Sequence, residues 1–120
     1  MQYTLTIPNG SNVSNALETR LLFGSTGHYM ETADLALAEI DCPATLPSIT
    51  SLNVQYSDDD GSTWNDLKDE SGLVVSLAVS AGTPVTISPA LAWRLPRQLR
   101  IKSNTNASAS RAFVLKFRKV

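Results

Sequence analysis

The chain turns at Ser57-Asp58-Asp59-Asp60-Gly61-Ser62-Thr63-Trp64, directly after an alternating segment, residues 52–56. Gly61 supplies the positive φ angle that a tight reversal needs. Aspartate side chains in such a turn accept hydrogen bonds from backbone N–H groups that the reversal leaves unpaired. Trp64 can fold back and cover the turn with a large apolar face. The stretch therefore predicts a β-hairpin and favours a binding or building domain over an enzyme.

Alternation of apolar and polar residues predicts strands on both sides of this hairpin. Residues 13–21 also have helical propensity, but their strand-rich surroundings favour a strand. Residues 73–79 form a nearly continuous apolar run, which is typical of a strand covered on both faces or of an interface strand. The strands that we expect are residues 2–7, 13–21, 33–41, 52–56, 64–67, 73–79, 85–88, 99–102 and 113–118.

Turn residues separate these segments at intervals of roughly ten residues, the spacing of a sandwich or barrel. The sequence thus predicts an all-β fold, an antiparallel β-sandwich of jelly-roll type with eight or nine short strands. A length of 120 residues predicts one domain spanning residues 1–120. No apolar run approaches the roughly 20 residues of a membrane helix, so we expect no membrane partner. The alternating N-terminus predicts cytoplasmic synthesis without an export signal.

Residues for catalysis are not recognisable in the chain. Cys42 and His28 are the only cysteine and histidine, which excludes a disulfide and a Cys/His metal site. Cys42 follows a strand and is predicted to be a small buried apolar residue. The chain has no Gly-x-Ser-x-Gly, P-loop or Gly-x-Gly-x-x-Gly motif, and no pair of carboxylates stands out for glycoside chemistry. We therefore expect no enzyme, no catalytic residue and no cofactor.

The three consecutive acids Asp58, Asp59 and Asp60 raise the question of calcium. An EF-hand count around Gly61 places Tyr56 at the first ligand position and Leu67 at the last, so that motif fails. A solvated turn and a looser calcium site are the two interpretations left open.

Charge is distributed unevenly along the chain. Every acid lies within the first 70 residues, and most bases lie at or after Arg94. Either the charges interleave on one solvated surface, or acidic and basic faces meet in neighbouring subunits, where complementarity would fix register. A net charge of −1 and few aromatic residues argue against nucleic acid. The candidate contact surfaces are the loops 23–32 and 41–50 and the basic residues Arg97, Arg100, Lys102, Lys116, Arg118 and Lys119.

The hairpin residues resemble an Asp-box, the hairpin that recurs in sialidase propellers; they are Ser57, Asp59, Gly61, Thr63 and Trp64. This chain has one copy, so sialidase activity does not follow. Similar hairpins occur in discoidin-like carbohydrate-binding sandwiches. Trp64 and Trp93 are therefore either buried in the sandwich or able to stack on a sugar. The alternative function is a carbohydrate-binding module, for instance on a phage tail.

A longer resemblance covers nearly the whole chain. Its residues are Thr6-Ile7-Pro8-Asn9-Gly10-Ser11 with Ser14, residues 52–57, Asp60-Gly61, Thr63-Trp64, Leu67 with Asp69 and Gly72, residues 99–103, and residues 113–115. This order is similar to that of small structural proteins of tailed bacteriophages. The resemblance implies a jelly-roll-like sandwich that decorates or cements the capsid, or sits elsewhere in the virion. Residues 23–50 are longer and less regular than in that family.

From this resemblance we expect a non-enzymatic virion protein, most of all a capsid decoration or cement protein. Its expected partners are the major capsid protein or another virion protein, and further copies of itself in a homo-oligomer.

Overall fold

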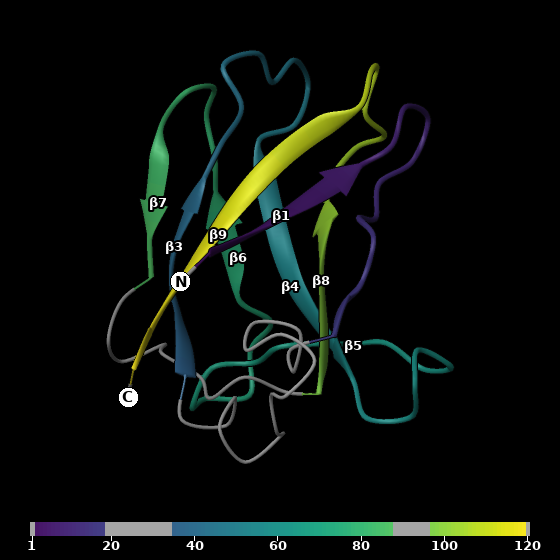
Figure 1. Cartoon of the computed structure of the whole chain (residues 1–120), viewed down its shortest axis with the longest axis vertical. Helices are drawn as coiled ribbons and strands as arrows, with labels where there is room; N and C mark the ends of the chain where they lie inside the picture. The colour runs from purple at the N-terminus through teal and green to yellow at the C-terminus, as the bar shows by residue number, and fades with distance from the viewer. Residues whose placement is uncertain (1, 19–34, 88–96, 120) are drawn as a thin grey trace.

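The computed structural model describes residues 2–18, 35–87 and 97–119, and within them the fold is all-β (Figure 1). Nine strands form two antiparallel sheets. The strands are β1 (Gln2–Ile7), β2 (Leu17–Glu18), β3 (Leu35–Asp41), β4 (Ser51–Ser57), β5 (Asn65–Asp66), β6 (Ser76–Ala78), β7 (Pro84–Thr86), β8 (Gln98–Ser103) and β9 (Arg111–Lys119).

The strand order is that of a jelly roll. The first sheet has the order β1-β9-β3-β7, and the second has β2-β8-β4 with β5 and β6 beyond β4. Both β5 and β6 pair with β4, at Gln55–Asp66 and at Leu52–Leu77 respectively. Apart from this shared partner, consecutive strands alternate between the two sheets, as in the double Greek key. The prediction of a jelly-roll-like antiparallel sandwich is confirmed.

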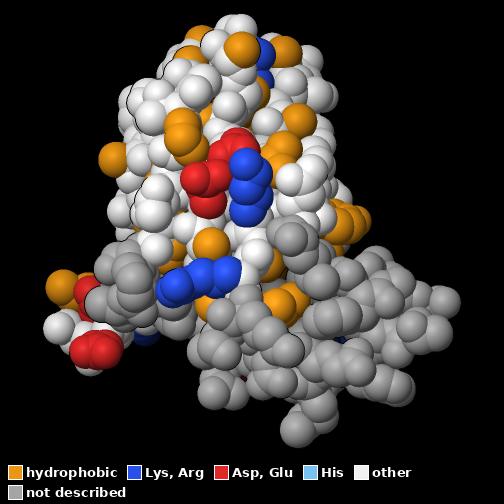
Figure 2. All heavy atoms as spheres, turned by 60° about the vertical axis from the view of Figure 1, so that its left-hand side comes forward, with side chains coloured by type: hydrophobic (Ala, Val, Ile, Leu, Met, Phe, Trp, Pro, Cys, Tyr) orange, Lys and Arg blue, Asp and Glu red, His pale blue; other side chains and the backbone are white. Residues whose placement is uncertain are grey.

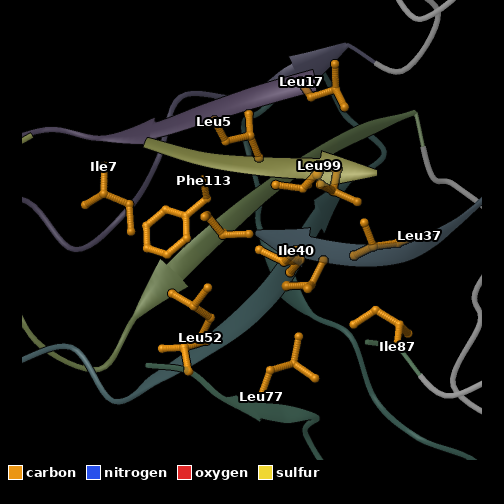
Figure 3. Close-up of a cluster of buried hydrophobic side chains, with 14 of the residues drawn as sticks. Leu5, Ile7, Leu17, Leu37, Ile40, Leu52, Leu77, Ile87, Leu99 and Phe113 are labelled. Atoms are coloured by element: carbon orange, nitrogen blue, oxygen red, sulfur yellow. The ribbon is translucent and has the colours of Figure 1, made fainter. Parts of the chain in front are cut away.

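The core lies between the sheets and follows the alternation of each strand. On β8, Leu99 and Ile101 are buried while Lys102 is exposed, so the predicted inward and outward faces are confirmed. Figure 3 shows the cluster, in which both sheets contribute fully buried side chains. These include Leu5, Ile7, Leu37, Ile40, Phe113 and Leu115 from the first sheet and Leu17, Leu52, Leu99 and Ile101 from the second.

Several predicted strands are shorter than the sequence suggests, among them 64–67, of which Asn65–Asp66 forms a strand. Of residues 13–18, the described part of the predicted strand 13–21, only Leu17–Glu18 forms a strand, although Val13 makes an isolated bridge to Lys102. The apolar run 73–79 is a strand only at Ser76–Ala78. Its residues Val75, Leu77 and Val79 are buried, whereas Leu73 is 66% exposed and Val74 44% exposed. The interpretation of a strand covered on both faces is wrong, because β6 covers the core with one face only.

Several predictions fall on residues outside the described ranges, namely the loop 23–32, His28, Trp93 and Arg94. Cys42 is half-buried and packs against the core, close to its predicted environment. Burial raises the pKa of its thiol. No helix in the described ranges is long and apolar enough to cross a bilayer.

Candidate functional site

The Asp-box-like hairpin joins β4 to β5, and its five motif residues lie together. The buried Ser57 hydroxyl donates to Asp59 Oδ1 at 2.8 Å and accepts from the Gly61 N–H at 2.9 Å. Asp59 Oδ1 also accepts from the Thr63 N–H at 2.8 Å. Gly61 has a φ of 86°, the left-handed value expected of it. The serine and aspartate thus supply the partners that the backbone loses in the turn.

This network makes the hairpin sensitive to acid. Hydrogen bonds from the Ser57 hydroxyl and the Thr63 backbone hold the pKa of Asp59 below its ordinary value. A carboxyl group whose pKa is lower in the folded state stabilises the fold above its unfolded pKa of about 3.9. That contribution is lost as the pH falls through the folded pKa.

We therefore expect Asp59→Asn to reduce the loss of stability on acidification below about pH 4. The measurement is the urea midpoint of the wild type and the variant over a pH series. Asp58→Asn is the matched control, because the exposed Asp58 makes no side-chain hydrogen bond within the described part of the chain. Asp41, whose pKa is also lowered, keeps some acid dependence in both variants. Equal pH profiles for the wild type and Asp59→Asn would contradict the expectation.

The outer face of the second sheet carries a row of interlocked polar side chains, which we call the closed row: Arg100, Gln55 and Asp66. They lie on the paired strands β8, β4 and β5. Arg100 Nε donates to Gln55 Oε1 at 2.7 Å, and Gln55 Nε2 donates to Asp66 Oδ1 at 3.0 Å. The Arg100 guanidinium lies 4.3 Å from the ring centroid of Trp64. Burial under this cover lowers the pKa of Arg100, and the charge of Asp66 opposes the shift.

The next row on the same face is different, and we call it the open row: Lys102, Asn53 and Ser76. Lys102 and Ser76 are the cross-strand partners of Asn53 on its two sides. None of the three side chains has a hydrogen-bond partner within the described residues. The open row forms the floor of a groove with a volume of ≈ 530 Å³. The other residues that line this groove are Asn12, Ser51, Val74, Ser103 and Asn104.

A second groove, of ≈ 650 Å³, lies on the other side of Val74. Its lining combines two aromatic side chains with polar and charged ones: Tyr56, Trp64, Asn65, Asp66, Leu67, Lys68 and Val74. Because Val74 borders both grooves, the polar face continues past it from one groove to the other.

The hairpin that carries Val74 protrudes between β5 and β6. The Asp69 carboxylate accepts from the N–H groups of Ser71 at 2.9 Å and Leu73 at 3.0 Å, and the Asp69 N–H donates to the Leu73 carbonyl at 2.8 Å. These bonds hold the tip in one shape. Leu73 and Val74 are the exposed large hydrophobic side chains of the described residues.

The predicted interface bases lie on two opposite surfaces. Arg97, Arg100 and Lys102 belong to β8 or its start, in the second sheet, whereas Lys116 and Arg118 lie on β9 in the first, where Lys119 ends the strand. Within the described residues, two of these bases form ion pairs with acids from earlier in the chain. Arg97 pairs with Asp60 at 2.7 Å, and Lys116 Nζ lies 3.2 Å from Glu39 and 2.9 Å from Asp41.

The pairing around Lys116 has the expected electrostatic consequence. Its hydrogen bonds to Asp41 and Glu39 raise the pKa of Lys116, and the hydrogen bond to Lys116 lowers the pKa of Asp41. Figure 2 shows acidic and basic side chains touching in one group on this side of the molecule. The described pairs therefore favour charges that interleave within the chain. Complementary acidic and basic faces between subunits stay a prediction.

One end of the sandwich has no charged residue in its loops, a feature that the local sequence pattern does not reveal. We call it the uncharged end; its loops are residues 8–16, 42–50, 79–83 and 104–110, and none contains Asp, Glu, Lys, Arg or His. Figure 1 shows these connections together at one end of the long axis. The lack of charged residues in each loop can be read from the sequence, but only the strand topology shows that the four loops lie at the same end.

Hydrogen bonds link the loops of the uncharged end to one another. The Gly10 N–H donates to the Ala107 carbonyl and the Gly82 N–H to the Pro43 carbonyl, both at 2.8 Å. The side chain of Asn104 accepts from the Thr50 and Ser51 N–H groups and donates to the Thr50 hydroxyl. The four loops therefore form one continuous surface, which exposes small, hydroxyl and amide side chains.

Metal ligands do not gather within residues 2–18, 35–87 and 97–119, where no group of three or more His, Cys, Asp or Glu side chains could hold an ion. Comparison of the sequence with models of protein families and with curated proteins gave no match.

Proposed function

We propose that the chain is a non-enzymatic structural protein of a tailed-bacteriophage virion, a decoration or cement protein that binds the capsid shell through its uncharged end. The partner in this proposal is the major capsid protein. The sequence resemblance to small virion proteins and the jelly-roll topology support it. The observation that carries it is the uncharged end itself.

A surface without charged residues loses little hydration energy when a partner covers it. A charged side chain that is buried in a contact without a partner costs several kcal/mol, and the centres of protein interfaces are accordingly depleted of charge. Within the described residues, the opposite end carries Asp58, Asp59 and Asp60 in the hairpin. The loops of the uncharged end therefore bring no charge of their own into a contact with a shell subunit. Arg111, at the start of β9, lies beside them and donates from Nη2 to the Ser108 hydroxyl at 3.5 Å.

Rigidity of this surface lowers the entropic cost of binding. Loops that must become ordered on binding lose part of the interaction energy, whereas linked loops have already lost that freedom. The bond from the Thr105 hydroxyl to the Ser48 carbonyl, at 3.0 Å, fixes the loop 42–50 in the same way as Asn104 does. Residues 42–50 of the predicted contact loop 41–50 thus belong to the proposed surface, whereas Asp41 ends β3 and pairs with Lys116.

Self-association is the second part of the proposal. Leu73 and Val74 protrude from the second sheet, and apolar side chains at such a tip suit a neighbouring copy on a shell lattice. Each copy then needs only weak contacts, because binding at several sites on one lattice multiplies their effect.

The test is binding of the purified chain to undecorated capsids, followed by sedimentation and by the temperature at which the capsids disrupt. We expect binding that raises the disruption temperature and persists in about 1 M NaCl, where the Debye length is about 3 Å. Ala81→Lys places a charge on the exposed part of the uncharged end, and it should lower the affinity at least tenfold, because an unpaired charge is then desolvated.

Ser62→Lys is the matched control, since it adds the same charge to an exposed position in the hairpin at the opposite end. It should bind capsids as the wild type does. Absence of binding even at low salt would remove the proposal. Binding that vanishes in high salt, with no effect of Ala81→Lys, would assign the contact to the basic residues of β8 and β9 instead.

A further inference from the structure

We propose that the open row, Lys102, Asn53 and Ser76, is the floor of an oligosaccharide-binding site on the outer face of the second sheet. The floor of this site lies on the sheet, and two residues at its margin, Asn12 and Asn104, also belong to loops of the uncharged end. Sugar binding goes beyond the structural role proposed above.

The chemistry of the groove matches a ligand rich in hydroxyl groups. Apart from Val74 and Lys102, the groove of the open row is lined by asparagine and serine residues. Amides and hydroxyls both donate and accept hydrogen bonds, as sugar hydroxyls do. Side chains on neighbouring strands repeat about every 4.8 Å across a sheet, a spacing comparable with the width of a sugar ring.

The polar side chains of the closed row bond to one another, whereas those of the open row have donors and acceptors left for a ligand. In the closed row, Gln55 is 6% exposed and both ends of its amide are bonded to charged neighbours. One row away on β4, Asn53 carries an amide of the same kind with no hydrogen-bond partner in the described residues. Backbone pairing on both sides fixes the position of Asn53 and the face of the sheet on which its side chain lies. The open row thus presents unpaired donors and acceptors on a backbone that is already held in place, so a ligand does not have to order the strands that carry them.

Aromatic side chains lie where a longer ligand would continue. Trp64 and Tyr56 line the second groove, which meets the first at Val74. Trp64 is half-buried, and Arg100 lies over its ring. Aromatic rings beside polar groups are the usual composition of small-molecule sites, and sugars present apolar C–H faces that pack on them.

Charge in the grooves favours a sugar over a nucleic acid. Among the described residues, Lys102 is the one base that lines the first groove, and the second groove combines Lys68 with Asp66. A nucleic-acid site would instead present several bases along the phosphate backbone.

The experiment presents the isolated full chain to an array of neutral and carboxylate-bearing oligosaccharides, followed by calorimetric titration with the oligosaccharide that binds best. We expect Asn53→Ala to weaken that binding about tenfold, the equivalent of one lost hydrogen bond to a fixed partner. Ser76→Tyr should abolish it by filling the groove, and Trp64→Ala should weaken it if the ligand reaches the second groove. Thr4→Ala, on the exposed face of the first sheet, is the control and should bind normally.

Urea midpoints of all variants are measured in parallel, so that a loss of binding is distinguished from a loss of folding. Absence of binding to every oligosaccharide on the array would overturn the proposal, as would undiminished binding by both Asn53→Ala and Ser76→Tyr. The experiments distinguish failure of the sugar-binding proposal from failure of the capsid-binding proposal. Asn53→Ala should still bind capsids, and Ala81→Lys should still bind the oligosaccharide.

Discussion

Phe113→Ala is expected to lower the free energy of unfolding by about 3–5 kcal/mol, the cost of replacing a buried phenylalanine with alanine. Phe113 is fully buried on β9, opposite Leu5 of β1. β9 pairs with β1 at Phe113 and with β3 from Val114 onward, so the backbone beside the ring is held in place. The space left by the ring therefore cannot collapse easily. Figure 3 shows the ring within the cluster that both sheets share.

Urea denaturation of the wild type and the variant measures this change, provided that the two unfolding slopes agree. Val114→Ala is the control on the same strand, because Val114 is half-buried and its side chain lies on the opposite face. Val114→Ala should lower the free energy of unfolding by about 1 kcal/mol or less, because the methyl groups that it removes are only partly buried. A cost below about 1.5 kcal/mol for Phe113→Ala would mean that the sheets can close over the cavity.

Gln55→Met is expected to cost about 2–3 kcal/mol, because hydrogen bonds to charged groups contribute about 1.5–3 kcal/mol each. Methionine keeps the length of the side chain but cannot accept from Arg100 Nε or donate to Asp66 Oδ1. The charged groups at both ends of the row would then lose their shared neutral partner beneath Trp64.

Asn53→Ala is the matched control for Gln55→Met, because it removes an amide from the same face of β4 that makes no hydrogen bond within the described residues. Its effect should stay within about 0.5 kcal/mol, as for most surface substitutions. Thermal or urea unfolding of the two variants and the wild type gives the comparison. If the two amides proved equally dispensable, the closed row would not be a stabilising network.

Local pattern was enough to predict the fold class and the inward face of most strands. The alternation of Leu99 and Ile101 with Lys102 depends on neighbours along one strand, and the structure follows it. The hairpin was equally local, because Ser57, Asp59 and Gly61 bond within four residues of one another. Such features are encoded in a short window, so a single sequence reveals them.

Features that depend on register between distant strands were not predictable in this way. The closed row joins Gln55 to Arg100 across 45 positions of sequence, and the uncharged end collects four loops that are far apart in the chain. Lys116 was predicted as a contact residue, but its pairing with Glu39 and Asp41 depends on the β3–β9 register, which shifts between Leu37 and Glu39. The apolar run 73–79 misled for a related reason, since hydrophobicity along the chain does not reveal that one face of the sheet is left uncovered.

β5 and β6 follow one another along the same edge of β4, and the chain between them leaves the sheet and returns to it. Each doubling of such an excursion adds only about 0.6 kcal/mol of closure entropy. Additional residues inserted at Ser71 and Gly72, at the exposed tip, would leave the register on either side unchanged. Descendants of this chain could therefore acquire an appended module at this edge, displayed away from the body, without any redesign of the scaffold.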